Sequence, residues 1–413
     1  MNIGKVRYSN LQNDLNFVFV DNKELPLICI DIWCKGGISF EEDGKEGTAH
    51  FLEHMIFKGS KKIKPGEFDF RIESLGGSSN AATGYDDSHY YVVIPPSNFE
   101  ESFSLLSNLV FLPTIDEHQF ELEKNVVIEE INQQNDQPDE NLYNYFQSRV
   151  WGEHIYGKTI LGNRKDLLSL QKDDLEFFHK KNYNANNVVI AIAGDLPKDF
   201  HSIELKEEIP YFKNSSIKKF DHLVNHSIRI GREEIEFEKL ELSRLFISWQ
   251  IPSINNQRAN IGFEILASIL AEGRNSRLFR CLKEEDNLVE SVFADVNSGE
   301  IGGLFTIEIC SEKEYLEEVE SKVHMILEDI NSIRKISHNE LNRAINIVKS
   351  NYLFNLETSA QLTSFYGSNL LWGRKYPLNG LKQHLVYWAE IENFKQITNY
   401  LNNNKFTLIA NGK

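Results

Sequence analysis

The chain has 413 residues, of which 41% are hydrophobic and 25% charged, as is usual for globular proteins. This length favours two or three domains, and no apolar run approaches the ~20 residues that a membrane-spanning helix needs. With 44 basic and 61 acidic residues the net charge is −17, which argues against nucleic acid and anionic membranes as partners. The N-terminus shows no secretory signal of the usual kind. We therefore expect a cytoplasmic protein.

The first half of the chain alternates strand and helix patterns. Residues 15–20 and 27–33 are apolar and flank the turn signal Asp21-Asn22, which predicts a β-hairpin. Residues 47–58 predict a helix with Thr48 as its N-cap and Gly59 just past its end. The further predicted elements are a helix over 69–75, strand structure over 78–95, helices over 99–112 and 116–134, and a buried strand over 187–193.

The same alternation begins again after a polar, charged stretch over 197–234, which we interpret as a linker. The repeated elements are strands over 245–251, 302–309 and 406–410 and helices over 261–270, 315–330 and 337–356. A repeat of about 200 residues is much longer than the period of a solenoid. We therefore predict two similar α/β domains, 1–215 and 216–413; two unrelated α/β domains are the alternative.

The strongest chemical signal is His50-Phe-Leu-Glu53-His54. Spacing of i and i+4 places both imidazoles on one face of a helix, as two corners of a zinc tetrahedron require. Glu53 projects near the same face, where it can take a proton from a zinc-bound water without ligating the metal. This order is the inverzincin pattern, and a chance match is expected roughly 0.03 times per chain. The alternative interpretation is a solvated helix face.

A third ligand is sought in the acidic segment 121–131. Glu123 and Glu130 are seven residues apart, nearly two helical turns, so they share one face, whereas Glu129 lies about 100° away. Two such carboxylates can supply one metal ligand and one partner for the other nitrogen of a histidine ring. Alone, acidic residues like these are usually solvated surface, and they gain significance only beside the histidine pair.

These motifs resemble peptidase family M16, which includes pitrilysin, insulin-degrading enzyme and the mitochondrial processing peptidase subunits. The length is closest to the short, two-domain bacterial-type members. The resemblance implies an α+β fold of two homologous α/β-roll domains, each a mostly antiparallel sheet packed with helices. It also implies that His50, His54 and Glu130 bind zinc, that Glu53 is the general base, and that Glu123 supports the site; manganese or cobalt could replace zinc in vitro.

Two further segments extend the resemblance. Residues 77–83 are similar to the family's edge strand, which pairs with the substrate backbone, so Asn80, Ala81 and Thr83 are expected to contact substrate. An ordinary strand after a glycine-rich turn is the alternative interpretation. Residues 274–279 are similar to a conserved segment of the family's second domain.

One departure from the family concerns two substrate-binding positions in the second domain. Many active members carry an arginine and, seven residues later, a tyrosine, where this chain has Lys283 and Glu290. Lysine lacks the planar fork of arginine, and a carboxylate repels a developing oxyanion. The resemblance implies a homo- or heterodimer with another M16 subunit. Because a second copy of this chain lacks the same two groups, we expect a heterodimer in which a homologous partner chain supplies them; a chain that works alone at reduced efficiency is the alternative.

The sequence thus predicts a zinc metalloendopeptidase that hydrolyses peptides or unfolded segments, which by resemblance are enclosed in a chamber. The competing hypothesis is a non-catalytic scaffold subunit of an M16-type complex. The intact set of His50, Glu53, His54 and Glu130 argues against a scaffold, whereas Glu290 argues for it. The other histidines considered, His89, His118 and His154, are expected to be surface or structural residues.

Overall fold

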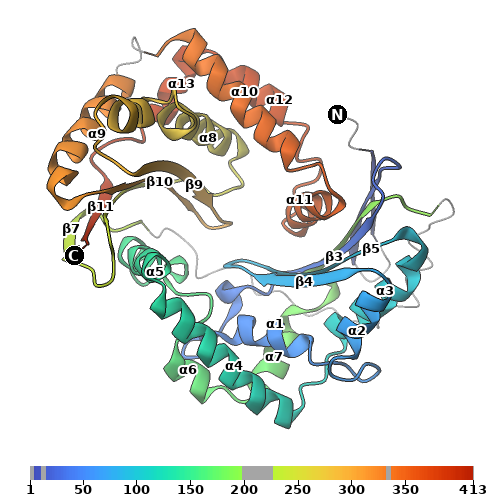
Figure 1. The fold of residues 1–413 in the computed structure, drawn as a ribbon. Helices are drawn as coiled ribbons and strands as arrows, with labels where there is room; N and C mark the ends of the chain where they lie inside the picture. The colour runs from blue at the N-terminus through green and yellow to red at the C-terminus, as the bar shows by residue number, and fades with distance from the viewer. Residues whose placement is uncertain (1–3, 11–14, 198–226, 332–335, 413) are drawn as a thin grey trace. The chain divides into compact units, whose positions relative to one another are not determined.

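The computed structural model describes residues 4–10, 15–197, 227–331 and 336–412 (Figure 1). The chain forms two compact units, and each of them contains segments from both halves of the sequence. Unit 1 comprises Met1–Gln133, Thr159–Phe220 and Leu353–Pro377, and unit 2 comprises Gln134–Lys158, Asp221–Tyr352 and Leu378–Lys413. The domain boundary predicted at 215/216 falls outside the described residues and stays a prediction. A single boundary at this position does not describe units that each contain three separate segments.

Unit 1 is built on a six-stranded sheet in the order β1-β2-β6-β3-β5-β4. The strands are β1 (Lys5–Asn10), β2 (Asn16–Asp21), β3 (Ile28–Cys34), β4 (Ser78–Thr83), β5 (Ser88–Ile94) and β6 (Val188–Gly194). All neighbouring pairs are antiparallel except β2 and β6, which run parallel. The strands predicted over 15–20 and 27–33 are present, but the predicted hairpin is wrong. The fully buried β6 lies between them, because an apolar strand is stabilised by pairing on both of its edges.

Helices cover both faces of this sheet, which is why every residue of β3 and β6 is buried. On one face α1 (Thr48–Ile56), α2 (Glu67–Ser74) and α3 (Phe99–Phe111) contact the β4–β5 hairpin. On the other face α11 (Ser359–Leu371) crosses β3 and β6 (Figure 1). The remaining helices of unit 1 are α4 (Glu117–Asp136), α6 (Arg164–Ser169) and α7 (Lys172–Asn182).

Unit 2 has a five-stranded sheet in the order β7-β11-β8-β10-β9. Its strands are β7 (Gly231–Glu236), β8 (Ser243–Ile251), β9 (Ser291–Ser298), β10 (Gly303–Ser311) and β11 (Lys405–Asn411). The parallel pair β7–β11 and the antiparallel pairs beyond it repeat the arrangement of β2-β6-β3-β5-β4. The predicted internal repeat is therefore confirmed in strand order and direction, and the predicted fold class is confirmed.

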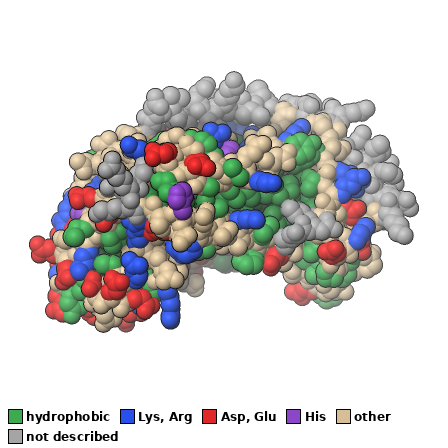
Figure 2. All heavy atoms as spheres, turned by 90° about the horizontal axis from the view of Figure 1, so that it is seen from above, with side chains coloured by type: hydrophobic (Ala, Val, Ile, Leu, Met, Phe, Trp, Pro, Cys, Tyr) green, Lys and Arg blue, Asp and Glu red, His purple; other side chains and the backbone are tan. Residues whose placement is uncertain are grey.

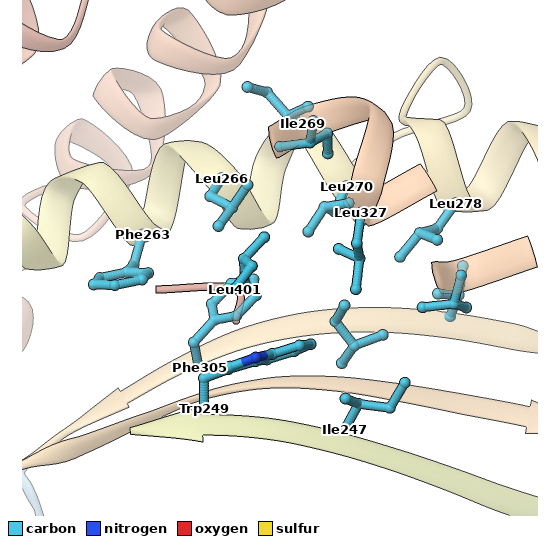
Figure 3. Close-up of a cluster of buried hydrophobic side chains, with 14 of the residues drawn as sticks. Ile247, Trp249, Phe263, Leu266, Ile269, Leu270, Leu278, Phe305, Leu327 and Leu401 are labelled. Carbon is cyan, nitrogen blue, oxygen red and sulfur yellow. The ribbon is translucent and has the colours of Figure 1, made fainter. Parts of the chain in front are cut away.

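The core of unit 2 lies between this sheet and its helices. Figure 3 shows Trp249 and Phe305 rising from the sheet toward Phe263, Leu266 and Leu270 of α8, and all five side chains are buried. Burying a side chain of this kind contributes about 1.5–3 kcal/mol. The helices of unit 2 are α5 (Pro138–Trp151), α8 (Gln257–Ala271), η6 (Phe279–Glu285, a π-helix), α9 (Leu316–Asn331), α10 (His338–Phe354), α12 (Leu381–Trp388) and α13 (Ile391–Thr398).

The two units exchange equivalent helices. In chain order α5 follows α4 as α11 follows α10, yet α5 belongs to unit 2 and α11 to unit 1. Gly367 permits the close approach of α11 to its sheet, because a Cβ atom there would lie 2.5 Å from Cδ1 of Trp33. The exchange means that each unit packs a helix from the opposite half of the sequence against its own sheet: α11 contacts β3 and β6, and α5 contacts β11.

Acidic and basic side chains of the described residues are interspersed over the face seen in Figure 2. Among the described helices, none combines the length and the hydropathy that crossing a membrane requires.

Candidate active site

Helix α1 carries the histidine motif, and its N-terminus is held by a distant carboxylate. Glu41 accepts hydrogen bonds from the backbone N–H groups of Gly47 at 3.1 Å and Ala49 at 2.8 Å. Gly47 adopts φ 92°, a left-handed conformation that glycine tolerates best. The prediction of Thr48 as the N-cap is wrong: Thr48 is the first helical residue, because Gly47 turns the chain and Glu41 provides the acceptor that a cap normally supplies.

The two histidines of α1 and one glutamate of α4 converge. Nε2 of His54 lies 3.4 Å from Oε2 of Glu130, and Nε2 of His50 lies 3.8 Å from the same oxygen. The ligand atoms of the three residues all lie within 4.8 Å of one another, and no other such group occurs in the described part of the chain. The convergence of these three predicted ligands is thus found in the structure.

The two separations from Glu130 are close to those of a zinc site. Bonds of about 2.0–2.1 Å in a tetrahedron place neighbouring ligand atoms about 3.3 Å apart. The observed separations of 3.4 and 3.8 Å from Glu130 exceed that value by only a few tenths of an ångström. Two imidazoles and a carboxylate are also a common ligand set of catalytic zinc, which keeps its fourth position open. The side chains present therefore fit a zinc ion.

Glu123 supports the site from the buried side of α4. Its Oε1 accepts a hydrogen bond from Nδ1 of His54 at 2.9 Å, and its Oε2 pairs with Nζ of Lys58 at 2.7 Å. Such a partner fixes the ring so that Nε2 is directed toward the metal position. Lys58 was not predicted as part of the site. It lies in the turn just after α1, four residues after His54, and this spacing was the usable signal.

The two histidines differ electrostatically. Burial lowers the pKa of His50, and the nearby charge of His54 lowers it further, which favours the neutral form that binds metals. Burial also lowers the pKa of His54, but hydrogen bonds to Glu123 and Glu130 outweigh it and bring that pKa to about 9. The carboxylates of Glu123 and Glu130 thus favour positive charge at the ring of His54.

Glu53, the predicted general base, lies on the same helix and is partly buried. Its Oε2 accepts a hydrogen bond from Oγ1 of Thr83 on β4 at 2.5 Å. Burial raises the pKa of Glu53 above its ordinary value, although the hydrogen bond from Thr83 acts in the opposite direction. A carboxylate in this environment is a stronger base than one in water.

Strand β4 forms the edge of the sheet beside this carboxylate. Among the described strands it pairs only with β5, and its residues alternate between exposed and partly buried. Asn80 is exposed, and its side-chain oxygen accepts a hydrogen bond from the backbone N–H of Ala81. Thr83 is one of the three predicted substrate contacts. Its hydroxyl is directed toward Glu53 and is hydrogen-bonded to that carboxylate.

Comparison with known proteins agrees with this geometry. The family model described as "Insulinase (Peptidase family M16)" matches residues 18–164, and the model described as "Peptidase M16 inactive domain" matches residues 169–348. The chain belongs to peptidase family M16. An uncharacterized zinc protease of Rickettsia bellii is 27% identical and covers 89% of this chain and 88% of its own. The uncharacterized zinc protease YmxG of Bacillus subtilis is 26% identical and covers 91% and 90%.

Two proteins with lower sequence identity extend the comparison. A probable mitochondrial-processing peptidase β subunit of Arabidopsis thaliana is 23% identical and covers 90% of this chain and 72% of its own. The crystal structure of a protease from Helicobacter pylori aligns with a TM-score of 0.88 and 23% identity, covering 99% of both chains. These likenesses confirm the M16 fold, and the names of the relatives support zinc as the metal.

Lys283 and Glu290, which the sequence analysis places at two substrate-binding positions of the family, lie close together in the structure. Lys283 lies in the π-helix η6, and its Nζ contacts the backbone oxygen of Glu290 and lies 3.5 Å from the Oε1 of that residue. Lys283 and Glu290 are therefore paired with each other.

The other three histidines considered from the sequence lie outside the metal cluster. His89 on β5 shares a 3.0 Å hydrogen bond with the buried Asp31 of β3, His118 is exposed, and His154 is buried in unit 2. The buried Asp31 was missed by sequence analysis, because nothing in the local pattern of β3 indicates a partner on β5.

Proposed function

We propose that this protein is a zinc-dependent endopeptidase in which His50, His54 and Glu130 hold the metal and Glu53 is the general base. The observation that carries the proposal is the convergence of the three ligand atoms within 4.8 Å, beside a carboxylate on the same helix. Family membership alone is insufficient, since a fold can persist after its chemistry is lost.

The side chains of this site have separable roles. A bound zinc ion supplies Lewis acidity, which polarises the scissile carbonyl and lowers the pKa of water toward ~7. Glu123 orients the ring of His54 through Nδ1. Glu53 takes a proton from the attacking water and then delivers it to the leaving amine, and its partly buried position favours both transfers.

The proposed substrates are peptides or unfolded segments in extended conformation. An added strand can pair with the edge of β4 that no described strand occupies, since the backbone supplies most of the hydrogen bonds and few side chains are specified. Asn80 and Ala81 lie on this edge, where the side chain of Asn80 must leave the N–H of Ala81 before a substrate carbonyl takes its place. The enclosure of substrates stays a prediction based on the family resemblance.

A homologous partner chain that carries the two groups missing here, and so forms a heterodimer, is part of the proposal. The pairing of Lys283 with Glu290 leaves neither group in the role of the family's arginine and tyrosine. The same observation favours the second candidate function, a non-catalytic scaffold subunit, whereas the intact metal cluster favours the enzyme.

A peptide-library assay of the zinc-loaded protein, with and without a homologous partner chain, separates the candidates. We expect about one zinc per chain, cleavage that rises when the partner is added, and loss of cleavage in Glu53→Gln with zinc retained. Normal turnover by Glu53→Gln would refute the assigned base. Bound zinc without cleavage under either condition would favour the scaffold.

A further inference from the structure

A pair of hydroxyl groups links the general base to the β4–β5 hairpin. Thr83 and Ser88 are direct cross-strand partners in the register of the hairpin, and their hydroxyl oxygens lie 3.4 Å apart. Ser88 is fully buried, and its hydroxyl donates a 2.9 Å hydrogen bond to the backbone oxygen of Gly36. Thr83 reaches across to Oε2 of Glu53 at 2.5 Å.

The direction of the Thr83 hydrogen bond follows from the chemistry of its partner. An ionised carboxylate only accepts, so the hydroxyl proton of Thr83 must be donated to Glu53. A hydrogen bond to an ionised group is about twice as strong as one between neutral groups. Thr83 also belongs to a strand whose backbone is fixed by its ladder with β5, and β-branching restricts its side-chain torsion. The hydroxyl is thus a stiff anchor.

The carboxylate of Glu53 needs such an anchor. Glutamate has three rotatable side-chain bonds, and Glu53 lies one residue before His54 and three after His50. Carboxylate oxygens are themselves zinc ligands. A freely rotating Glu53 can therefore turn toward the metal position and occupy the place that the attacking water needs.

We propose that Thr83 is a positioning residue that holds Oε2 of Glu53 and thereby keeps Oε1 available to the attacking water. The inference rests on the proposed peptidase function and assigns Thr83 a role other than the substrate contact predicted from the sequence. It also connects substrate binding with proton transfer, because β4, the strand proposed to pair with the substrate backbone, also carries the hydroxyl that holds Glu53.

Substitutions at Thr83 test the proposal, and the chain offers a matched control. Thr83→Val removes the hydroxyl at nearly constant shape, whereas Thr83→Ser retains it. Thr306→Val removes a similar cross-strand hydroxyl pair in the second sheet, where Oγ1 of Thr306 lies 2.9 Å from Oγ of Ser248. We expect kcat to fall about 30–100-fold in Thr83→Val, since small misplacements of reacting groups cost factors of this order. KM and zinc content of Thr83→Val should change little. The kcat of Thr83→Ser and of Thr306→Val should stay within about threefold of the value for the unsubstituted enzyme.

A second readout does not depend on turnover. After replacement of zinc by cobalt, the visible absorption of Thr83→Val should weaken as Glu53 enters the coordination shell, whereas Thr83→Ser should keep the original spectrum. If the unsubstituted protein cleaves nothing but the spectra differ in this way, the peptidase proposal fails and the anchoring of Glu53 stands. An unchanged kcat in Thr83→Val, or an equal loss of kcat in Thr83→Val and Thr83→Ser, would overturn the inference. If the protein shows no turnover, identical cobalt spectra of the unsubstituted chain and Thr83→Val would overturn it as well.

Discussion

Removing the Glu123 carboxylate should weaken zinc binding more than it weakens the fold. In Glu123→Gln the acceptor at Nδ1 of His54 loses its charge, and Nζ of Lys58 loses its 2.7 Å ion pair. The ring then has no charged partner at Nδ1 to fix its orientation. The ligands His50 and Glu130 keep their positions, so the site should still bind metal with reduced affinity.

The magnitude follows from the kind of contact removed. Loss of such an outer partner typically lowers metal affinity about 10–100-fold, which corresponds to about 1.4–2.8 kcal/mol. The effect on the metal-free fold should be smaller, because the side chain of Lys58 is 32% exposed and water replaces much of its ion pair. Partly exposed pairs of this type contribute about 0–1 kcal/mol.

A competition titration against a chromophoric zinc chelator measures the affinity, and denaturant unfolding of the metal-free protein measures stability. Glu129→Gln is the matched control, because Glu129 lies on the same helix with its side chain exposed and outside the cluster. It should leave zinc affinity unchanged. A Glu123→Gln protein that binds zinc within twofold of the unsubstituted chain would show that the hydrogen bond to His54 does not support the site.

Three further predictions concern the stability of the metal-free protein, measured by denaturant unfolding. Burial raises the pKa of Glu264 from 4.5 to about 7, so the folded state loses stability as pH rises through that window. Glu264→Gln should therefore stabilise the protein by about 3 kcal/mol above pH 7 and hardly at all near pH 4. Burial lowers the pKa of His89, but Asp31 raises it more, so the net pKa is above its ordinary value. The ion pair therefore contributes its full stability below about pH 6.5 and loses it as pH rises through the pKa of the folded state. His89→Gln should lower the free energy of unfolding more at about pH 5.5 than at about pH 9. Gly367→Ala should cost about 1–3 kcal/mol, because its methyl group collides with Trp33, and an unchanged midpoint would contradict the close approach.

The metal cluster could be predicted from the sequence because its information is local. The i, i+4 spacing of His50 and His54 and the seven-residue spacing of Glu123 and Glu130 each fix a common helical face before any tertiary contact is known. Only the meeting of the two helices required the family resemblance. Most element positions agree with the structure for a similar reason, since hydrophobic periodicity is read within one element.

The errors concern pairing between distant segments. The hairpin expected from 15–33 failed because β6, more than 150 positions further along the chain, inserts between β2 and β3. Helix α11 was missed, although Thr358 and Gln361 form a capping box that marks its start. The direction of the Thr83 side chain depends on the register of β4 against β5, and a shift of one residue would turn it to the other face.

The internal repeat separates what the fold supplies from what the side chains supply. In chain order α8 and α10 of unit 2 correspond to α1 and α4 of unit 1, which carry the metal cluster. Between α8 and α10, Tyr352 donates a 3.1 Å hydrogen bond to Glu264, and the described residues of unit 2 contain no group of metal ligands. The same strand order and the same succession of helices thus hold a metal cluster in one unit and a tyrosine–glutamate pair in the other. The scaffold brings two helices together, and the chemistry at their contact is decided by four or five side chains.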